Sequence, residues 1–370
     1  MRWWALPALA SAAYQLLAIA AALRWKLAGA SAPPPGSRPQ PLSVLKPLYG
    51  GDDRLYAALR SHACQNYPQF EILFGARGPH DAALAEVARL RREFPAVPMR
   101  VIVAETSAPN PKAGVLARLA AEAKHPLLLI NDDDIEVPPG YFHRVTAPLA
   151  NARVGLVTCL YRARADSLPA RLEALGVATD FAPSVMVARF LGMEGFALGA
   201  TMAMRAETLR KIGGFEPIAG YLADDYELGR RVAATGLAIQ LAPVVVDTGL
   251  GGGRWRDVWR HQLRWARTIR VSRAAGYFGS AITHTTVWAL VAFAAGAWPA
   301  GAAALAARLA AAWIAGAVVL QDAQVKRRFW LLPARDLFAF AVWAAGCLGS
   351  TVYWRGLKLR LDRQGRIQPE

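Results

Sequence analysis

The chain has 370 residues, 54% of them hydrophobic, and a formal net charge of +16. This length allows one large domain or two modest ones. Its three cysteines lie far apart, which excludes a disulfide framework and a cysteine zinc site. Lys and Arg gather beside apolar segments, in 254–273, 326–335 and 355–366, as expected at an anionic membrane surface. Because no zinc finger, basic recognition helix or aromatic-rich nucleic-acid motif occurs, we expect no nucleic-acid partner.

The N-terminal segment is almost wholly apolar from Trp3 to Leu23, and basic residues follow it. This is long enough to span a membrane. A cleaved signal peptide is the alternative, but the apolar run is too long for a typical signal core and further apolar segments follow. We therefore expect an uncleaved anchor over 1–26, with the basic residues holding that end in the cytoplasm. A stiff linker, rich in proline, is expected over 27–41.

Residues 42–250 alternate between short strand patterns and helical patterns of about ten residues. This rhythm predicts βαβ units and one α/β domain with a mainly parallel sheet. The expected strands are Ser43–Leu45, Phe70–Phe74, Met99–Ala104 and Pro126–Ile130, and the expected helices are Leu55–Cys64, Ala82–Phe94 and Lys112–Ala123.

The C-terminal part predicts a membrane-associated region. Residues 251–279 form an amphipathic, Arg-rich segment that we expect to lie along a membrane interface. Within 280–354 we expect transmembrane segments: a helical hairpin over 280–320 and a further span over 337–354. Four spans in total would place the basic tail, 355–370, on the outer side against the positive-inside rule. Either the last segment is re-entrant or the tail is an exception.

Three consecutive aspartates, Asp132 to Asp134, follow the expected strand Pro126–Ile130. Ligands of open α/β sheets bind at the carboxyl ends of the strands. Neighbouring carboxylates repel one another unless a cation or a proton joins them, and oxygen ligands suit Mg²⁺ or Mn²⁺. An ordinary solvated acidic turn is the alternative.

Further motifs follow in order along the chain. The lysine of Asn110-Pro-Lys112 either neutralises a diphosphate at a helix start or merely follows a capping Asn. Asp224 and Asp225 come after a Gly-Gly-Phe turn, where they either cap a helix or supply a base. A basic helix carries His261-Gln-Leu-Arg264-Trp265.

Taken together with Lys46-Pro47, these motifs resemble family 2-type glycosyltransferases with a GT-A nucleotide-sugar fold. The likeness is greatest to the ceramide glucosyltransferase group (families 2 and 21), which includes bacterial enzymes that glycosylate hopanoids. The resemblance covers about residues 42 to 275 and implies a UDP-sugar donor and a membrane lipid acceptor.

The resemblance also implies roles for individual residues. Lys46, Pro47 and Lys112 would meet the nucleotide and its diphosphate. Asp132 and Asp134 would form the Asp-x-Asp pair, with Asp132 also contributing to donor binding, and either or both would coordinate Mg²⁺ or Mn²⁺. Asp133 would face away, because alternate strand residues point to opposite faces. Asp225 would be the general base, Arg264 would contact the diphosphate or the acceptor region, and Trp265 would wall the acceptor site.

Two positions depart from the family pattern. His261 stands where the family has Gln or Arg. Gly78 stands where an Asp normally helps to bind the nucleobase, and Asp81 is the candidate substitute.

The sequence thus predicts an inverting enzyme that transfers glucose or N-acetylglucosamine from a UDP-sugar to a lipid hydroxyl. We expect it in a bacterial inner membrane, with the catalytic domain in the cytoplasm. A processive polysaccharide synthase of the same fold and a non-catalytic basic membrane scaffold are the alternatives. The apolar stretch 181–196 is either buried core or a groove through which the lipid enters.

Overall fold

The computed structural model describes residues 3–29, 38–51, 54–250, 253–354 and 356–368. The chain divides into two compact units. The first, here called the sheet unit, comprises Gly29–Tyr161 and Met193–Gly249, and the second, the helical unit, comprises Met1–Ala28, Arg162–Gly192 and Leu250–Glu370. The predicted domain over 42–250 is therefore interrupted, because 162–192 belongs to the helical unit.

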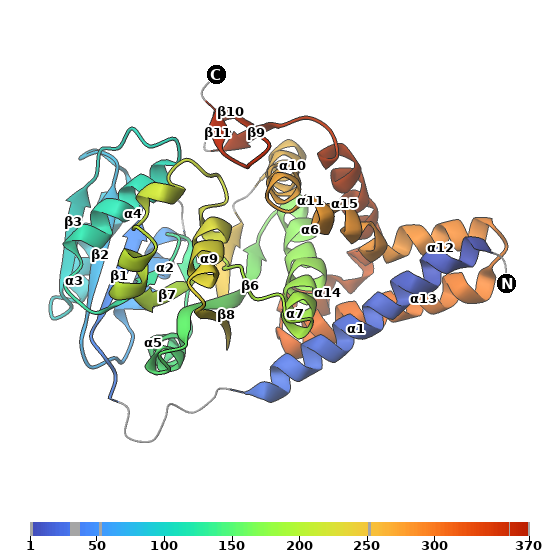
Figure 1. The fold of residues 1–370 in the computed structure, drawn as a ribbon, viewed down its shortest axis with the longest axis horizontal. Helices are drawn as coiled ribbons and strands as arrows, with labels where there is room; N and C mark the ends of the chain where they lie inside the picture. Colours follow the sequence, from blue (N-terminus) through green and yellow to red (C-terminus); the bar gives the residue numbers. More distant parts are fainter. Residues whose placement is uncertain (1–2, 30–37, 52–53, 251–252, 355, 369–370) are drawn as a thin grey trace. The chain divides into compact units, whose positions relative to one another are not determined.

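The sheet unit is built on an eight-stranded mixed sheet with the order β3-β2-β1-β4-β7-β6-β8-β5 (Figure 1). Strands β1 to β4 pair in parallel, whereas the β4/β7, β6/β7 and β5/β8 pairs are antiparallel. The four strands predicted from the sequence are all present. The strands are β1 (Leu42–Pro47), β2 (Phe70–Ala76), β3 (Met99–Val103), β4 (Leu127–Ile130), β5 (Ile135–Glu136), β6 (Val154–Ala165), β7 (Met202–Arg205) and β8 (Ala238–Leu250).

Helices cover this sheet through two hydrophobic clusters. Alternate residues of a strand point to opposite faces, so Val44 belongs to one cluster with Leu59 of α2, and Leu45 belongs to the other with Leu116 of α4 and Leu228 of α9. The helices of this unit are α2 (Leu55–Ala63), α3 (Ala83–Glu93), α4 (Pro111–Glu122), α5 (Tyr141–Thr146), α8 (Ala206–Lys211) and α9 (Asp224–Ala234).

The helical unit consists of helices and one small antiparallel sheet, β11-β10-β9. The helices are α1 (Leu6–Ala28), α6 (Leu168–Gly176), α7 (Ala182–Phe190), α10 (Trp255–Ser272), α11 (Ala274–Gly279), α12 (Thr285–Ala294), α13 (Trp298–Ala312), α14 (Ala323–Arg328) and α15 (Leu332–Gly346). Two π-helical segments, Val177–Phe181 and Trp313–Val319, continue α6 and α13. The strands are β9 (Thr351–Trp354), β10 (Leu357–Leu361) and β11 (Ile367–Gln368).

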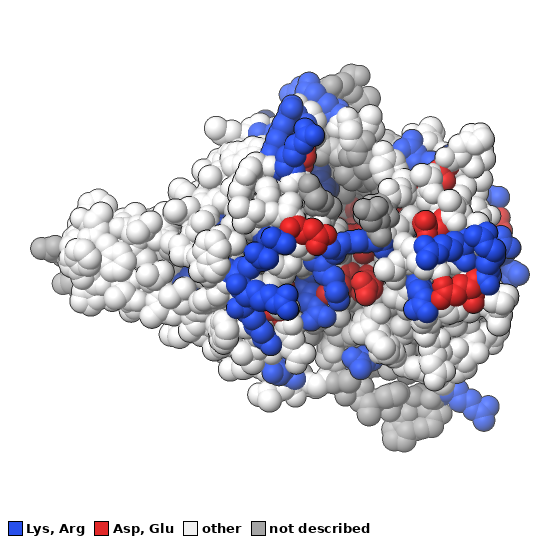
Figure 2. Space-filling model, turned by 180° about the vertical axis from the view of Figure 1, so that it is seen from behind, with Lys and Arg blue, Asp and Glu red and all other residues white. Residues whose placement is uncertain are grey.

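Helices α1, α12 and α13 pack together through small side chains, among them Ala8, Ala289 and Ala304. Small residues allow helices to approach closely, as in membrane bundles. Across the described residues, two helical stretches are long and apolar enough to cross a membrane, Trp3–Ala28 and Trp298–Val319. The part of the surface formed by these three helices is nearly free of charged side chains (Figure 2).

Two predictions for the C-terminal part need correction. Residues 337–354 do not form one span, because α15 ends at Gly346 and a turn at Gly349, with a φ of 71°, leads into strand β9. The basic tail contributes strands β10 and β11. The hairpin over 280–320 is present, but α12 has only 10 residues, too few to span a bilayer.

Helix α10 packs against the end of α15. Arg267 donates from Nε to the carbonyl of Leu348 at 3.0 Å, and Arg270 hydrogen-bonds to the carbonyl of Cys347. The arginines therefore satisfy carbonyl groups that the end of α15 leaves without helical partners.

Candidate active site

The Asp cluster begins where β4 ends, and a buried asparagine fixes that end. Asn131 donates from Nδ2 to the carbonyl oxygen of Ala200 at 2.7 Å and to the hydroxyl of Tyr141 at 2.8 Å. The chain then turns at Asp133 and Asp134 before β5. Strand alternation does not apply inside this turn, so it does not determine the direction of the Asp133 side chain. Asp133 Oδ2 accepts a hydrogen bond from the backbone N–H of Tyr49 at 2.8 Å.

Asp134 is held by strand pairing. Ile135 of β5 pairs with Thr248 of β8, and the hydroxyl of Thr248 donates to Asp134 Oδ2. Burial, reinforced by the negative charge of Asp132, raises the pKa of Asp134 to about 6. A carboxylate whose charge is disfavoured in this way is stabilised by a bound cation.

Lys46 is fully buried at the end of β1 and donates from Nζ to the backbone carbonyl of Asp132 at 2.7 Å. Burial lowers the pKa of Lys46 to about 8, although the three aspartates oppose that shift. The lysine thus holds the backbone of the Asp turn in place. Pro47, the last residue of β1, leads into the loop that contains Tyr49.

Lys112 lies in the first turn of α4, whose N-terminus is capped by Asn110: its side-chain oxygen accepts from the backbone N–H of Lys112 at 3.0 Å. The ammonium group of Lys112 is 2.7 Å from Asp132 Oδ1 and 3.4 Å from Asp224 Oδ2. Burial opposes the charge of Lys112, but these carboxylates outweigh it and raise the lysine's pKa. Asn110 thus caps the helix, and Lys112 lies within the acidic site. That Lys112 neutralises a diphosphate stays a prediction.

Asp225 is the second residue of α9, and two backbone N–H groups hold its carboxylate. Gly199 N–H donates to Oδ2 at 2.8 Å and Tyr226 N–H to Oδ1 at 2.7 Å. Burial, together with the charge of Asp224, raises the pKa of Asp225 to about 6. Neither aspartate caps α9, because Ala223 occupies the cap position and no side-chain cap bond forms there.

Gly199 lies close to both Asp225 and Asp132. A Cβ atom at Gly199 would lie 3.1 Å from Asp225 Oδ2 and 3.7 Å from Asp132 Oδ2. Two carboxylates, one from β4's end and one from α9, thus face the same small space at one edge of the sheet. The sequence does not predict the roles of Gly199 and Thr248, because neither belongs to a charged motif. For Gly199 the one local signal is the Gly-Ala-Thr sequence that precedes β7.

Asp81 lies between two loops of the same edge. Its Oδ1 accepts from Gly50 N–H, after β1, at 3.1 Å and from Ala83 N–H, at the start of α3, at 3.0 Å. Gly78 follows β2, and a Cβ atom there would meet no atom within 4 Å. The position that lacks the expected carboxylate is therefore open, and Asp81 is fixed nearby in the chain.

Arg264 and Trp265 belong to the helical unit, whereas the residues described above belong to the sheet unit. Trp265 packs against Phe181, with ring centroids 5.8 Å apart, and against His261 at 5.1 Å. Glu173 of α6, 4% exposed, accepts from Gln262 at 2.8 Å and contacts His261 Nδ1. Glu173 thus fixes the start of the His-Gln-Leu-Arg-Trp segment, a role without a sequence signal because it lies about ninety residues earlier.

The acidic residues of the sheet unit fit a divalent cation that is shared with a ligand. Among the described residues, no group of three or more His, Cys, Asp or Glu side chains is placed to hold a metal alone. Mg²⁺ commonly binds through one or two carboxylates plus substrate phosphates and water. Asp132 and Asp134 supply two carboxylates of that kind, and burial together with the charge of Asp132 disfavours the ionised form of Asp134.

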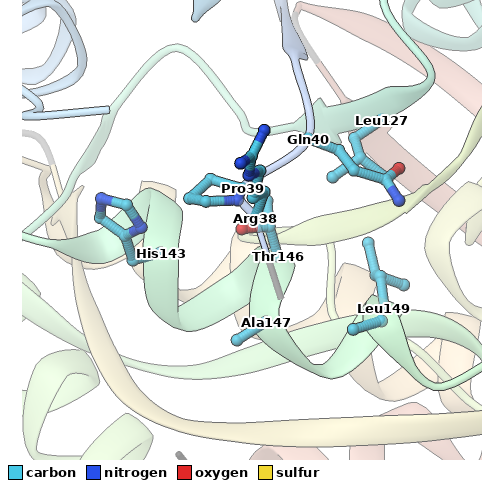
Figure 3. A pocket seen from close by; sticks show the side chains of 9 residues that line it. Arg38, Pro39, Gln40, Leu127, His143, Thr146, Ala147 and Leu149 are labelled. Carbon is cyan, nitrogen blue, oxygen red and sulfur yellow. The ribbon is translucent and has the colours of Figure 1, made fainter. Parts of the chain in front are cut away.

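A pocket of about 70 Å³ lies elsewhere in the sheet unit (Figure 3). Gln40, Leu127 and His143 are among its lining residues, so it adjoins the amino ends of β1 and β4, opposite the Asp cluster. Ligand pockets are usually several hundred Å³. This pocket is therefore not a nucleotide-sugar site.

Comparison with solved structures defines the class of fold. A mannosyltransferase from Pyrobaculum calidifontis, solved with GDP-mannose and Mn²⁺, has a TM-score of 0.56 at 20% identity. The alignment covers 93% of this chain and 97% of that one. The fold is thus of the GT-A glycosyltransferase type. The sequence model of glycosyl transferase family 21 matches residues 3–367, and the chain belongs to this family.

Two relatives from Caenorhabditis elegans are named ceramide glucosyltransferases. Ceramide glucosyltransferases 1 and 3 are 29% and 27% identical to this chain over 198 residues. Each match covers 53% of this chain but only 42% and 43% of the relatives. The chain thus matches less than half the length of these relatives.

Proposed function

We propose that this glycosyltransferase transfers glucose or N-acetylglucosamine from a UDP-sugar to the hydroxyl of a membrane lipid, such as a ceramide or a hopanoid, with inversion at the anomeric carbon. The observation that supports this proposal is that the carboxylates of Asp225 and Asp132 both come close to Gly199: a Cβ atom there would lie 3.1 Å from Asp225 Oδ2 and 3.7 Å from Asp132 Oδ2. Donor-binding and base functions then lie within one small space. The names of the relatives support the lipid acceptor, and the mannosyltransferase supports a nucleotide-sugar donor.

In this proposal each residue has one task. A Mg²⁺ or Mn²⁺ ion held by Asp132 and Asp134 would neutralise charge on the donor diphosphate. Lys112 holds Asp132, Lys46 supports the turn, and Asp81 lines the donor side. Asp225 accepts the proton of the lipid hydroxyl as it attacks the anomeric carbon in line with departing UDP. A single displacement of this kind inverts the configuration and needs no covalent enzyme intermediate.

The helical unit supplies the lipid side of the reaction. Its two long apolar helices would anchor the chain, and Arg24 and Lys26 near the C-terminal end of the first would hold the sheet unit on the cytoplasmic side of a bacterial inner membrane. Arg264 and Trp265 would bind the acceptor region. A lipid substrate explains why a nucleotide-sugar enzyme carries such helices.

The test is a transfer assay with the full-length protein in lipid, Mn²⁺, labelled UDP-glucose or UDP-N-acetylglucosamine, and ceramide or a bacterial lipid extract. We expect a labelled product that extracts into organic solvent. Asp225→Asn should lower turnover by about 10²- to 10⁴-fold, because an amide cannot accept the proton. Glu207→Gln, an exposed carboxylate on α8, is the matched control and should retain activity. A water-soluble polymer would instead identify a polysaccharide synthase, and full activity of Asp225→Asn would refute the assigned base.

A further inference from the structure

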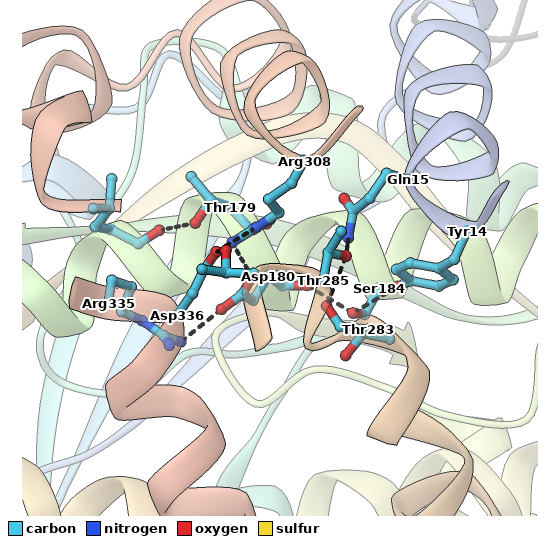
Figure 4. Close-up of polar contacts among 12 residues, drawn as sticks. Tyr14, Gln15, Thr179, Asp180, Ser184, Thr283, Thr285, Arg308, Arg335 and Asp336 are labelled. Carbon is cyan, nitrogen blue, oxygen red and sulfur yellow. Dashed lines mark hydrogen bonds and ion pairs between the residues drawn. The ribbon is translucent and has the colours of Figure 1, made fainter. Parts of the chain in front are cut away.

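The helical unit contains a cluster of four charged side chains, none of which belongs to the candidate active site (Figure 4). Arg308 of α13 pairs with Asp336 of α15 and with Asp180, each at 2.6 Å. Arg335 pairs with the other oxygen of Asp180 at 2.9 Å. Arg308 lies in the apolar stretch Trp298–Val319. Charged residues in such a helix are rare and mark functional sites, because burying them is unfavourable.

The four members differ in accessibility. The side chains of Arg308, Arg335 and Asp336 are 3%, 7% and 6% exposed, whereas that of Asp180 is 32% exposed. The cluster therefore presents one anion to the outside and buries the groups that hold it in place. Each carboxylate oxygen has two lone pairs, so Asp180 can accept further hydrogen bonds while it pairs with both arginines.

Two hydroxyl groups are linked to the backbone of Asp180 through hydrogen bonds. Ser184, exposed and one helical turn after Asp180, donates from Oγ to the carbonyl oxygen of Asp180 at 2.7 Å. The hydroxyl of Tyr14, from α1, lies 3.2 Å from Ser184 Oγ. Figure 4 shows Tyr14, Ser184 and Asp180 converging from α1 and the π-helix–α7 segment. A few convergent polar groups on an apolar surface are typical of small-molecule sites.

The same segment contacts the Arg-Trp motif. Phe181, next to Asp180, packs against Trp265. The π-helix Val177–Phe181 lies between α6 and α7, and such local π-helices occur frequently at functional sites. The hydrogen-bonding groups and the motif tryptophan are thus joined through two adjacent residues.

We propose that Asp180, Ser184 and Tyr14 bind the polar headgroup of the lipid acceptor, with Asp180 accepting hydrogen bonds from its hydroxyl or amide N–H groups. This inference rests on the proposed function and adds its acceptor site. A carboxylate favours neutral lipids that carry hydrogen-bond donors and repels phosphate headgroups. The two buried arginines do not attract anions, because Asp180 and Asp336 balance their charges.

The test measures apparent KM values for ceramide and for the UDP-sugar with the full-length protein. We expect Asp180→Asn to raise the ceramide KM about tenfold, as loss of a charged hydrogen bond does, with the donor KM unchanged. Asp336→Asn is the matched control: it also removes a carboxylate from Arg308, but its side chain is buried. Both variants should unfold at a lower temperature, and only Asp180→Asn should weaken ceramide binding. Ser184→Ala, at an exposed position, should raise the ceramide KM several-fold without lowering the unfolding temperature.

A photoactivatable ceramide, added without donor, separates this inference from the proposed function. Labelling of the wild type at low probe concentration that is reduced in Asp180→Asn and Ser184→Ala, but kept in Asp336→Asn, would support the site even if no sugar were transferred. In that case the failure would lie with the proposed reaction. Equal labelling of all variants, equal ceramide KM values in Asp180→Asn and Asp336→Asn, or no labelling of the wild type would overturn the inference.

Discussion

Gly199 is the residue on which the geometry of the candidate active site depends most directly. Its N–H holds Asp225 Oδ2 at 2.8 Å, and a Cβ atom there would approach that oxygen to 3.1 Å. We expect Gly199→Ala to displace the carboxylate and to lower turnover on the order of 10- to 100-fold, because misplaced reacting groups are costly. Gly195→Ala is the control, since its Cβ atom would meet its nearest neighbour at 3.7 Å. Equal turnover of the two variants, measured by transfer to lipid, would contradict the prediction.

The protonation of Asp225 predicts the pH dependence of turnover. Burial raises the pKa of this carboxyl to about 6, and only the deprotonated form accepts a proton. Turnover at saturating donor and Mn²⁺ should therefore rise with pH through about 6 and level off above it. Saturation matters because Asp134, whose pKa is also raised, must be ionised for donor binding. A rate that is flat between pH 5 and pH 8 would exclude Asp225 as the titrating base.

Asp81 and Gly78 predict how the nucleobase is bound. If Asp81 substitutes for the absent carboxylate, Asp81→Ala should raise the donor KM. Gly78→Asp, added to that variant, should restore donor binding, because the position is open and its backbone needs no glycine conformation. The measurement is the KM for the UDP-sugar in both variants. Asp81 also holds Gly50 and Ala83 N–H, so failure of the rescue would indicate that it acts only on the loops.

Helix α9 sets the position of Asp225, and its packing predicts a stability effect. A Cβ atom at Gly229 would lie 2.5 Å from the backbone nitrogen of Ala197. Backbone cannot move aside cheaply, so Gly229→Ala should destabilise the protein by about 1–3 kcal/mol, as overpacking does. Gly220→Ala, with no atom within 4 Å of its Cβ position, should leave the unfolding temperature unchanged. An unaltered unfolding temperature for Gly229→Ala would show that α9 can shift away from the 196–197 segment.

At the element scale, the sequence predicts those strands and helices that are determined by the hydrophobic pattern of neighbouring residues. The parallel strands β1 to β4 and the helices α2 to α4 follow from hydrophobic periodicity, and the sequence placed the carboxylates of the Asp turn and of α9. The contact between Lys112 and Asp224 joins residues more than one hundred positions apart, and no local signal encodes it. The assignment of 162–192 to the helical unit was missed for the same reason: α7 is apolar whether it packs in an α/β core or against α1.

At the scale of the whole molecule, hydropathy over-predicted membrane spans. The apolar residues of 337–354 are divided between the helix α15 and the strand β9, because α15 ends at Gly346 and Gly349 turns the chain. Composition alone cannot distinguish a helix that faces lipid from one that faces protein. The exposure of individual side chains in the structure does distinguish the two kinds of helix.

Leu16 offers a test of membrane insertion, because it is 60% exposed near the middle of α1. A charge at the centre of a spanning helix opposes insertion by about 2.5–3.5 kcal/mol. Leu16→Arg should therefore reduce the fraction of protein that stays in the membrane pellet after alkaline extraction. Leu27→Arg is the control: this residue is 84% exposed but lies beside Lys26 at the helix end, where a long basic side chain reaches water. Equal retention of the two variants would mean that α1 lies against a surface rather than across the hydrocarbon, and the lipid acceptor would then have to reach the enzyme from the interface alone.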